Sequence, residues 1–189
     1  MKTALILSGV NEEHAHAKNV ESEVAVDLER RGYEVRTLRL PQLHLAPCTG
    51  CFECWTENPG QCKLRDDGNK LIAAVIASDI VVLSGPVSFG GYCSELKKGI
   101  DRLLPLVSPF FRSINGETHH IRRYRRYPAF LGVGLQTVPD SEEAVIFREL
   151  VRRTGIDLKA NRAASCVVGL DQPAVPIRTA IDQLTMGAS

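Results

Sequence analysis

The sequence predicts an α/β domain in which helices cover both faces of a parallel sheet, and three observations support this. Short apolar runs that end at turn residues alternate five times with longer segments of helical periodicity. The 189 residues are 44% hydrophobic and 24% charged, which is enough apolar material for one core. The composition shows no break, repeat or low-complexity tract. We therefore expect a single domain spanning residues 1–189.

Two strands and two helices are predicted in the first half of the chain. Thr3–Leu7 is a short apolar run that stops at a Ser-Gly turn, as a buried strand does. Apolar residues recur at helical spacing over residues 20–28, and Glu34–Leu38 is typical of a second strand. A cysteine-rich loop is expected at about 40–65. The second helix has Asp66 or Asp67 as its expected cap, and its buried face is formed by Leu71, Ile72, Val75 and Ile76.

Three strands and three helices follow. Asp79–Leu83 is almost entirely apolar, which favours a parallel strand covered on both faces, and it is expected to stop at Ser84-Gly85-Pro86. The next helix is predicted over Ser94–Leu104, because Pro105 cannot continue it. The remaining elements are, in order, a strand at Ala129–Val133, a helix capped by Ser141 that runs to Arg153, a strand at Ala164–Val168 and a helix at Pro173–Met186.

Five such units predict the strand order of the sheet. They fit the flavodoxin-like doubly wound order 2-1-3-4-5 better than the six-stranded dinucleotide-binding order, because no G-x-G-x-x-G follows the first strand. In this fold ligands bind beyond the carboxyl ends of the strands, where the chain reverses direction. The loops after the first, third and fourth strands are therefore the places to look for a site.

Charge and hydropathy exclude several classes of partner. Lys and Arg number 23 against 22 Asp and Glu, a formal charge of +1, so we expect no nucleic-acid partner. The longest apolar run, Leu71–Ala77, is far shorter than the roughly 20 residues that cross a bilayer, and the N-terminus has no apolar segment of signal-peptide length. We expect a cytoplasmic protein, without a membrane partner, whose six cysteines remain thiols.

The loop after the third strand carries a family resemblance. The segment Ser84–Glu95, followed by Leu96-Lys97 and Asp101-Arg102, resembles the flavin-ring loop of NAD(P)H-dependent FMN reductases. The resemblance implies that the FMN ring is positioned by Pro86, Val87, Ser88, Phe89, Gly90 and Gly91. Glycines allow the backbone to approach a planar ring, and Phe89 or Tyr92 could cover one of its faces. The alternative is an ordinary strand-to-helix turn stiffened by proline.

The cysteine-rich loop carries a second resemblance. It is similar to the cysteine segment of iron-sulfur flavoproteins, which belong to the same broad group and hold a 4Fe-4S cluster beside FMN. The resemblance implies that the cluster ligands are Cys48, Cys51, Cys54 and Cys62. The alternatives are free thiols near the flavin and a redox-active disulfide such as Cys54 with Cys62. Zinc usually binds two separated Cys-x-x-Cys pairs, whereas three of these cysteines share one run.

The loops after the first and fourth strands complete the expected FMN site. Relatives place Gly-Ser-Pro-Arg in the first loop, and here the arginine is missing and Glu12 and Glu13 would repel a phosphate. The side chains that could donate to the phosphate are Ser8, Asn11, His14 and His16. After the fourth strand, Gly132 and Gly134 resemble the glycine-containing turn that closes over the flavin.

A basic loop is expected at about 108–127, and it holds the strongest charge run, His119–Tyr127. Basic residues interleaved with aromatic residues can bind nucleic acid, but one short run on a chain of charge +1 does not favour that function. Such a run is more often a solvated or subunit-contacting loop. A third hypothesis is that Arg122 and Arg123 contact the phosphates of NAD(P)H, or of FMN in a neighbouring subunit.

Together the resemblances imply an FMN-dependent oxidoreductase that transfers electrons from NAD(P)H, its co-substrate, through flavin to a small acceptor such as a quinone or free flavin. No side chain need act as a nucleophile, and Trp55 or Phe89 would shape the stacking space. The alternative is an iron-sulfur flavoprotein that passes single electrons to a redox protein partner. A third reading is a flavodoxin-shaped binding module that has lost FMN. The resemblance also implies a homodimer or homotetramer.

Overall fold

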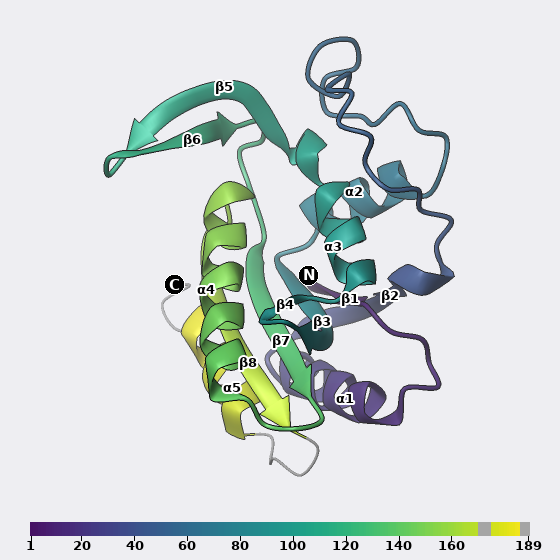
Figure 1. Ribbon diagram of the computed structural model, residues 1–189, viewed down its shortest axis with the longest axis vertical. Coiled ribbons are helices and arrows are strands. Elements are labelled where there is room, and N and C mark those ends of the chain that lie inside the picture. Colours follow the sequence, from purple (N-terminus) through teal and green to yellow (C-terminus); the bar gives the residue numbers. More distant parts are fainter. Residues whose placement is uncertain (170–174, 186–189) are drawn as a thin grey trace.

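The chain folds around a twisted parallel sheet (Figure 1), and the computed structural model describes residues 1–169 and 175–185. The order of the main strands is β2-β1-β3-β7-β8. Their bounds are β1 (Lys2–Ser8), β2 (Tyr33–Arg39), β3 (Ile80–Ser88), β7 (Ala129–Gln136) and β8 (Ala163–Gly169). All four pairings between neighbours are parallel. Numbered along the chain, these five strands have the order 2-1-3-4-5, so the predicted doubly wound sheet is confirmed.

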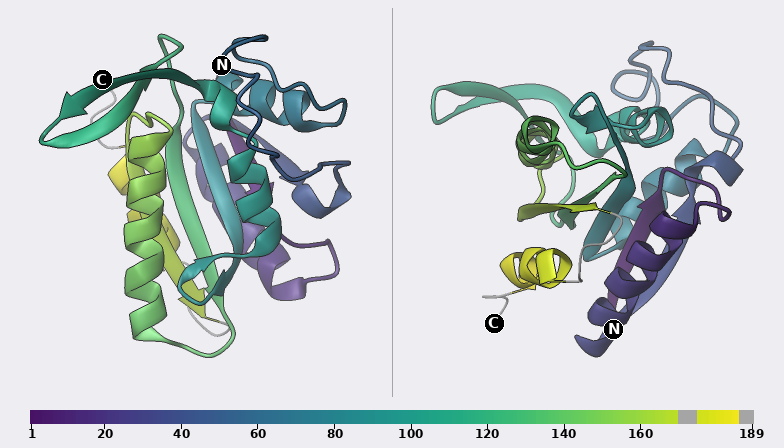
Figure 2. Two further views of the ribbon diagram at one scale, coloured as in Figure 1. Left: turned by 45° about the horizontal axis from the view of Figure 1, so that its top comes forward. Right: turned by 60° about the horizontal axis from the view of Figure 1, so that its bottom comes forward.

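Helices cover both faces of the sheet (Figure 2). One face packs against α1 (Ala15–Arg30) and α5 (Val175–Thr185), and the other packs against α2 (Gly68–Ala77), α3 (Ser94–Asp101) and α4 (Ser141–Asp157). Alternate residues of each strand point to opposite faces, so Ile6 joins the core under α1 whereas Leu7 joins the core under α2 and α3. The central strands are apolar throughout because both of their faces are buried.

The third strand runs further than the sequence predicts. Instead of stopping at Ser84-Gly85-Pro86, β3 continues to Ser88 and turns back into the short antiparallel strand β4 (Gly91–Tyr92). Proline is tolerated within β3 because β1 ends at Ser8, opposite Ser84, so this end of β3 has lost its neighbour on one side. The carboxyl end of β3 is therefore a hairpin rather than an open loop.

Two helix boundaries also differ from prediction. The predicted helix over Ser94–Leu104 ends early, because α3 stops at Asp101 and a 3₁₀ turn, η2 (Leu104–Leu106), contains Pro105. The cap of α4 is Asp140, not Ser141: its Oδ1 accepts hydrogen bonds from the backbone N–H groups of Glu142 and Glu143 at 2.9 and 3.0 Å. Of the predicted last helix, Pro173 and Met186 lie outside the described residues.

The expectation of a basic loop at about 108–127 is wrong for most of the segment. Strands β5 (Val107–Ile114) and β6 (Glu117–Arg122) form an antiparallel hairpin that projects from the body of the molecule (Figure 1). The turn is Asn115-Gly116, with φ values of 51° and 81°. Both values are positive, as a two-residue type I′ hairpin turn requires, and Asn-Gly is its strongest sequence signal. Arg153 of α4 holds the hairpin through Glu117 at 2.8 Å.

The cysteine-rich segment is a loop, as predicted, preceded by the short 3₁₀ turn η1 (Leu40–Gln42). In Figure 1 this loop extends at the top, above α2 and α3, whereas the arrowheads of β7 and β8 point to the bottom. The cysteines are thus carried away from the carboxyl ends of those strands. Within residues 1–169 and 175–185, none of the helices combines the length and apolar character needed to span a bilayer.

Candidate functional site

A cavity of about 670 Å³, called here the carboxyl-end cavity, lies beyond the ends of β1 and β3. From these two strands the chain continues to strands on opposite sides of the sheet, β2 after β1 and β7 after β3. The loop after β1, the 3₁₀ turn after β2 and the first turns of α3 form the walls of the cavity. The lining residues are Gly9, Val10, Asn11, Glu13, His14, Pro41, Glu95 and Lys98. This volume is ordinary for a small-molecule site, and its position is the switch point at which doubly wound sheets bind ligands.

The structure divides the four residues predicted in the first loop. Asn11 and His14 line the cavity, whereas Ser8 and His16 do not. Ser8 is fully buried, and its hydroxyl donates to the carbonyl of Val10 at 3.2 Å. His16 lies in the first turn of α1, and its Nε2 is buried without a hydrogen-bond partner. Only two of the four side chains therefore line the cavity.

His14 has a defined role at the start of α1. Its Nδ1 accepts a hydrogen bond from the backbone N–H of Ala17 at 3.3 Å. An imidazole that accepts at Nδ1 carries its proton at Nε2 when neutral, so Nε2 is a donor. The first N–H groups of a helix also lack intrahelical partners and favour an anion. The wall formed by His14 is therefore suited to a negatively charged group.

Two cations at or near the cavity, Lys98 and Arg39, were not predicted from the sequence. Lys98 lines the wall and pairs with Glu95 at 2.7 Å. Arg39 lies just behind the first loop, where its Nη1 donates to Ser8 Oγ at 3.1 Å and to Glu21 Oε2 at 3.0 Å. Arg39 stands opposite Ser8 in the pairing of β2 with β1. The predicted pairing of the second strand with the first could therefore have indicated Arg39, whereas the sequence of the first loop alone could not.

The six residues from Pro86 to Gly91 gather in the β3–β4 hairpin at the carboxyl end of β3. Its two turn residues, Phe89 and Gly90, have φ values of 50° and 73°. The left-handed conformation costs a residue with a side chain about 1–2 kcal/mol, and strain of this kind concentrates at ligand sites. The side chain of Phe89 is 94% exposed. None of the six residues lines the cavity beside Lys98.

The prediction for Gly132 and Gly134 needs correction. Both lie inside β7, which continues to Gln136, so they are not part of a turn. A Cβ added to Gly132 would overlap the side chain of Val151 in α4, at 2.9 Å from Cγ1 and closer still to Cγ2. A Cβ added to Gly134 would lie 2.6 Å from Val87 Cγ2 and 2.9 Å from the ring of Phe147. These glycines allow α4 to approach the sheet closely.

The four clustered cysteines lie in one loop but differ in exposure. Cys48 and Cys51 are exposed, Cys62 is half-buried and Cys54 is buried. Burial, followed by the electrostatic influence of the neighbouring Cys62, Cys48 and Cys51, raises the pKa of the Cys54 thiol. All six cysteines are free thiols. Among the residues that the structure describes, no group of three or more His, Cys, Asp or Glu side chains is close enough to hold a metal ion.

Arg102 joins the two ends of the cysteine-rich loop. It is fully buried, and its Nη1 donates to the carbonyl of Ala46 and to Asp66 Oδ2, both at 2.6 Å. Its Nη2 donates to Asp66 Oδ1 at 2.8 Å and to Cys62 Sγ at 3.3 Å. The guanidinium holds the pKa of Asp66 well below its usual value. The sequence reading placed Arg102 in the flavin-loop motif, and its contacts with the cysteine loop were not predicted.

Trp55 anchors the cysteine loop instead of facing the carboxyl-end cavity. Its indole N–H points at the carbonyl oxygens of Leu104 and Val107, at 3.4 and 3.1 Å. Its ring stacks on Phe52 and contacts the ring of His120, with centroids 5.2 and 4.8 Å apart. Of the two aromatic residues predicted to shape a stacking space, Phe89 alone lies at the carboxyl end of β3.

The two arginines of the basic segment bind their own chain. Arg122 Nη2 donates to the carbonyl of Lys159 at 3.5 Å, and its guanidinium lies 5.5 Å from the ring centre of Tyr127. Arg123 donates to the carbonyls of Pro105 and Val107 at 3.0 and 3.2 Å. These contacts fix the base of the hairpin. The hypothesis that the two side chains contact phosphates stays a prediction.

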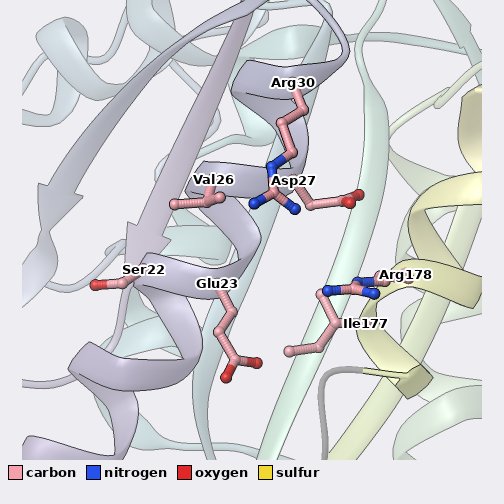
Figure 3. A pocket seen from close by; sticks show the side chains of 7 residues that line it. All are labelled: Ser22, Glu23, Val26, Asp27, Arg30, Ile177 and Arg178. Carbon is pink, nitrogen blue, oxygen red and sulfur yellow. The ribbon is translucent and has the colours of Figure 1, made fainter.

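A smaller cavity of about 310 Å³ lies between α1 and α5 (Figure 3). Val26 and Ile177 form its apolar floor, and Glu23, Arg30 and Arg178 surround it. It sits on helix faces rather than at strand ends, and none of the predicted site residues lines it. The carboxyl-end cavity is therefore the stronger candidate.

Comparison with known proteins places this geometry in a family context. The profile of the family described as NADPH-dependent FMN reductase matches residues 1–119. An iron-sulfur flavoprotein from Archaeoglobus fulgidus is 33% identical over 105 residues, which are 56% of this chain and 46% of that protein. An iron-sulfur flavoprotein from Methanocaldococcus jannaschii is 36% identical over 75 residues, covering 40% and 38%. The chain thus spans about half, or less, of the length of the curated relatives it matches.

Solved structures share the fold over nearly the whole chain. An NAD(P)H:quinone oxidoreductase from Methanothermobacter marburgensis superposes with a TM-score of 0.69 at 11% identity, covering 98% of both chains. An NADH:FMN oxidoreductase in its apo form gives a TM-score of 0.67 at 16% identity, covering 100% of this chain and 91% of the other. At these identities the likeness is one of fold.

Proposed function

The chain belongs to the NADPH-dependent FMN reductase family, and we propose that it is an oxidoreductase that passes electrons from NAD(P)H through FMN to a small acceptor such as a quinone or free flavin. One observation carries the proposal: a cavity of about 670 Å³ lies at the switch point of the sheet and is lined by Asn11, His14 and Lys98. Bound FMN would supply a ring that can take up a hydride from a nicotinamide and release electrons to an acceptor.

The residues at the cavity fit the phosphate end of FMN. His14 Nε2–H, the Asn11 amide and the Lys98 ammonium are donors, and the first N–H groups of α1 add a partial positive charge. Glu13 and Glu95 also line the wall, and Lys98 pairs with Glu95, so Lys98 has to offset carboxylates as well as hold the phosphate. This donor set makes Lys98 the side chain on which phosphate affinity depends most.

The β3–β4 hairpin fits the ring end of FMN. Its main-chain groups would contact the polar edge of the ring, and Phe89 offers an exposed aromatic face at the tip. The strained backbone at Phe89 supports a functional role for this residue, because glycine or asparagine would adopt the same turn at lower cost. We retain Pro86–Gly91 as the proposed ring-binding segment.

Replacing Lys98 with glutamine is expected to raise the dissociation constant for FMN about tenfold. A hydrogen bond to a charged group contributes about 1.5–3 kcal/mol, and about 1.4 kcal/mol corresponds to a factor of ten. Binding of riboflavin, which has the same ring without the phosphate, should change by less than twofold. Titrations of the apo-protein with both flavins, followed by flavin fluorescence, measure the two effects.

Lys97→Gln is the matched control for this experiment. Lys97 is the neighbouring lysine, but it pairs with Asp101 on the exposed side of α3 and does not line the cavity. FMN binding by this variant should equal that of the wild type. Equal losses in the two lysine variants would mean that the cavity does not hold the phosphate.

A second candidate function is electron transfer through a 4Fe-4S cluster beside FMN. It is favoured by the relatives named iron-sulfur flavoproteins and by the hydrogen bond from Arg102 to Cys62 Sγ, because hydrogen bonds to the sulfur atoms are one of the means by which proteins tune such clusters. Cys48, Cys51, Cys54 and Cys62 would be the ligands, which requires the loop to bring their sulfur atoms closer together than they lie in this structure. Single electrons would then pass to a redox protein partner.

The visible absorption spectrum of anaerobically purified protein, with iron and acid-labile sulfide assays, separates the candidates. Flavin bands alone favour the reductase, and flavin bands on a broad iron-sulfur background favour the electron carrier. In the second case Cys62→Ser should lower the iron and sulfide content while FMN binding is retained. Colourless protein that cannot be reconstituted with FMN would favour a binding module. Sedimentation measurements test the expected homodimer or homotetramer.

A further inference from the structure

A second cavity, of about 600 Å³, lies at the opposite end of α3 from the carboxyl-end cavity. Glu95 and Lys98 face the first cavity, whereas Ile100 and Asp101 face the second. Its other walls are the β5–β6 hairpin, the last residue of α4 with the one after it, and the cysteine-rich loop at Cys48 and Gly50. The described cysteine loop thus borders this cavity and not the one at the carboxyl ends.

One wall of the second cavity is a row of aromatic rings in contact, which ends at the exposed ring of Phe111. The ring of Phe111 lies against His120, with centroids 4.3 Å apart and planes tilted by 33°. His120 in turn contacts Trp55 at 4.8 Å. Phe111 is 61% exposed although it is a large apolar side chain on a strand. A face of this kind favours a planar ring that stacks on it.

The charges around this cavity differ from those at the carboxyl ends. Its lining contains the carboxylates of Asp101 and Asp157, and among the described lining residues there is no Lys or Arg. Asp101 pairs with Lys97, and Asp157 lies 3.6 Å from His119. Phosphate-bearing molecules such as FMN and NAD(P)H are therefore disfavoured here, because like charges repel.

We propose that the second cavity binds an uncharged compound with a planar conjugated ring of quinone size, stacked on Phe111 beside Cys48. Its volume lies within the usual range for small-molecule sites. Five apolar side chains, including Phe111, line it beside five polar ones. This proposal goes beyond the proposed function, which requires only the cavity at the carboxyl ends. It assigns a function to the β5–β6 hairpin, which the FMN site does not use.

Trp55 reports on this cavity because it is the only tryptophan in the chain. Its indole ring contacts His120, and its N–H is directed at the carbonyls of Leu104 and Val107. His120, Leu104 and Val107 all line the cavity. The probe is tetramethyl-1,4-benzoquinone, whose ring carbons are all substituted, so that thiols do not add to it. We expect a saturable change in Trp55 fluorescence both in the apo-protein and in the protein saturated with FMN.

Phe111→Ala should raise the dissociation constant of the probe about tenfold, since loss of a stacked ring removes its pair energy as well as buried area. The side chain is exposed, so the variant is expected to fold. Phe110→Ala is the matched control, because Phe110 is 69% exposed, lies next in the chain and does not line the cavity. Its affinity should stay within twofold of the wild type.

Four results would overturn the proposal. A fluorescence change that never saturates, or that is equal in Phe111→Ala and Phe110→Ala, would mean that the probe only collides with the surface. Loss of probe binding on saturation with FMN would place the probe in the carboxyl-end cavity. Tighter binding of anthraquinone-2-sulfonate than of unsubstituted anthraquinone would contradict the charge argument. FMN titrations of the Lys98 variant are unaffected by any of these results, so the proposed function is tested separately.

Discussion

Replacing Arg102 with methionine is expected to lower the free energy of unfolding by about 3–5 kcal/mol, because it leaves the carboxylate of Asp66 buried without its cation. The backbone carbonyl of Ala46 and the thiol of Cys62 lose a donor in the same variant. Urea denaturation followed by far-UV circular dichroism measures the loss. Cys62 should also react faster with a thiol reagent, because the loop around it is released.

The double variant Arg102→Met/Asp66→Leu is the control for this effect. A buried ion pair replaced by apolar residues of similar size is often close to neutral, so removing the stranded carboxylate should restore about 1 kcal/mol or more. A single variant as stable as the wild type would contradict the interpretation of Arg102 as the anchor of the loop. A double variant no better than the single one would assign the loss to the Ala46 and Cys62 contacts.

The same pair gives a dependence on pH. Arg102 lowers the pKa of Asp66 in the folded state, so the pair contributes stability above the unfolded pKa of about 4. That contribution declines as the pH falls from there toward the folded pKa. The difference in unfolding free energy between the wild type and Arg102→Met should therefore be largest near neutral pH and should narrow below about pH 4. A difference that stayed constant down to pH 2.5 would contradict this.

Replacing Gly132 with alanine is expected to cost about 2–3 kcal/mol of stability while FMN affinity stays unchanged. The new methyl group would overlap Val151, and overpacking a close-packed interior costs about 1–3 kcal/mol. FMN should still bind, because Gly132 contacts α4 instead of the carboxyl-end loops. Thermal unfolding and FMN titration of the same protein sample measure both quantities.

The second-site variant Val151→Ala provides the control, since it removes the methyl groups that the alanine would strike. On its own it should destabilise the protein by leaving a cavity, but combined with Gly132→Ala it should recover much of the loss. A Gly132→Ala protein of normal stability that bound FMN weakly would restore the interpretation of this glycine as a cofactor contact.

The sheet could be predicted because its central strands are buried on both faces. Residues such as Val81–Leu83 are uniformly apolar for that reason, and each run ends where the chain emerges at a turn. The β5–β6 hairpin was missed because most residues of its strands are exposed, so no apolar alternation shows in Phe111–Arg122. Its Asn115-Gly116 turn was the one local signal available.

The candidate site was less predictable than the fold because it depends on contacts between distant segments. Asn11 and His14 could be found by position in the first loop, whereas Lys98 reaches the same cavity from a helix more than eighty residues later. Arg39 and Arg102 could not be assigned from local sequence, because their partners are distant in the chain. Arg39 contacts Ser8 on the neighbouring strand, and Arg102, at the end of α3, contacts Asp66, which precedes α2. Gly132 was misassigned because the sequence does not distinguish a glycine that allows a helix to pack close to the sheet from one that allows a flavin ring to approach the backbone.

The contacts of Arg102 have a consequence for any chemistry at the cysteines. These contacts hold Ala46 and Asp66 together, so the chain between them is already a closed loop before any thiol reacts. In an open chain, the entropy of bringing the ends together would oppose every step that gathers the four sulfur atoms. Here that entropy is already lost on folding, so the thiols meet at a higher effective concentration than the same residues would in a free peptide.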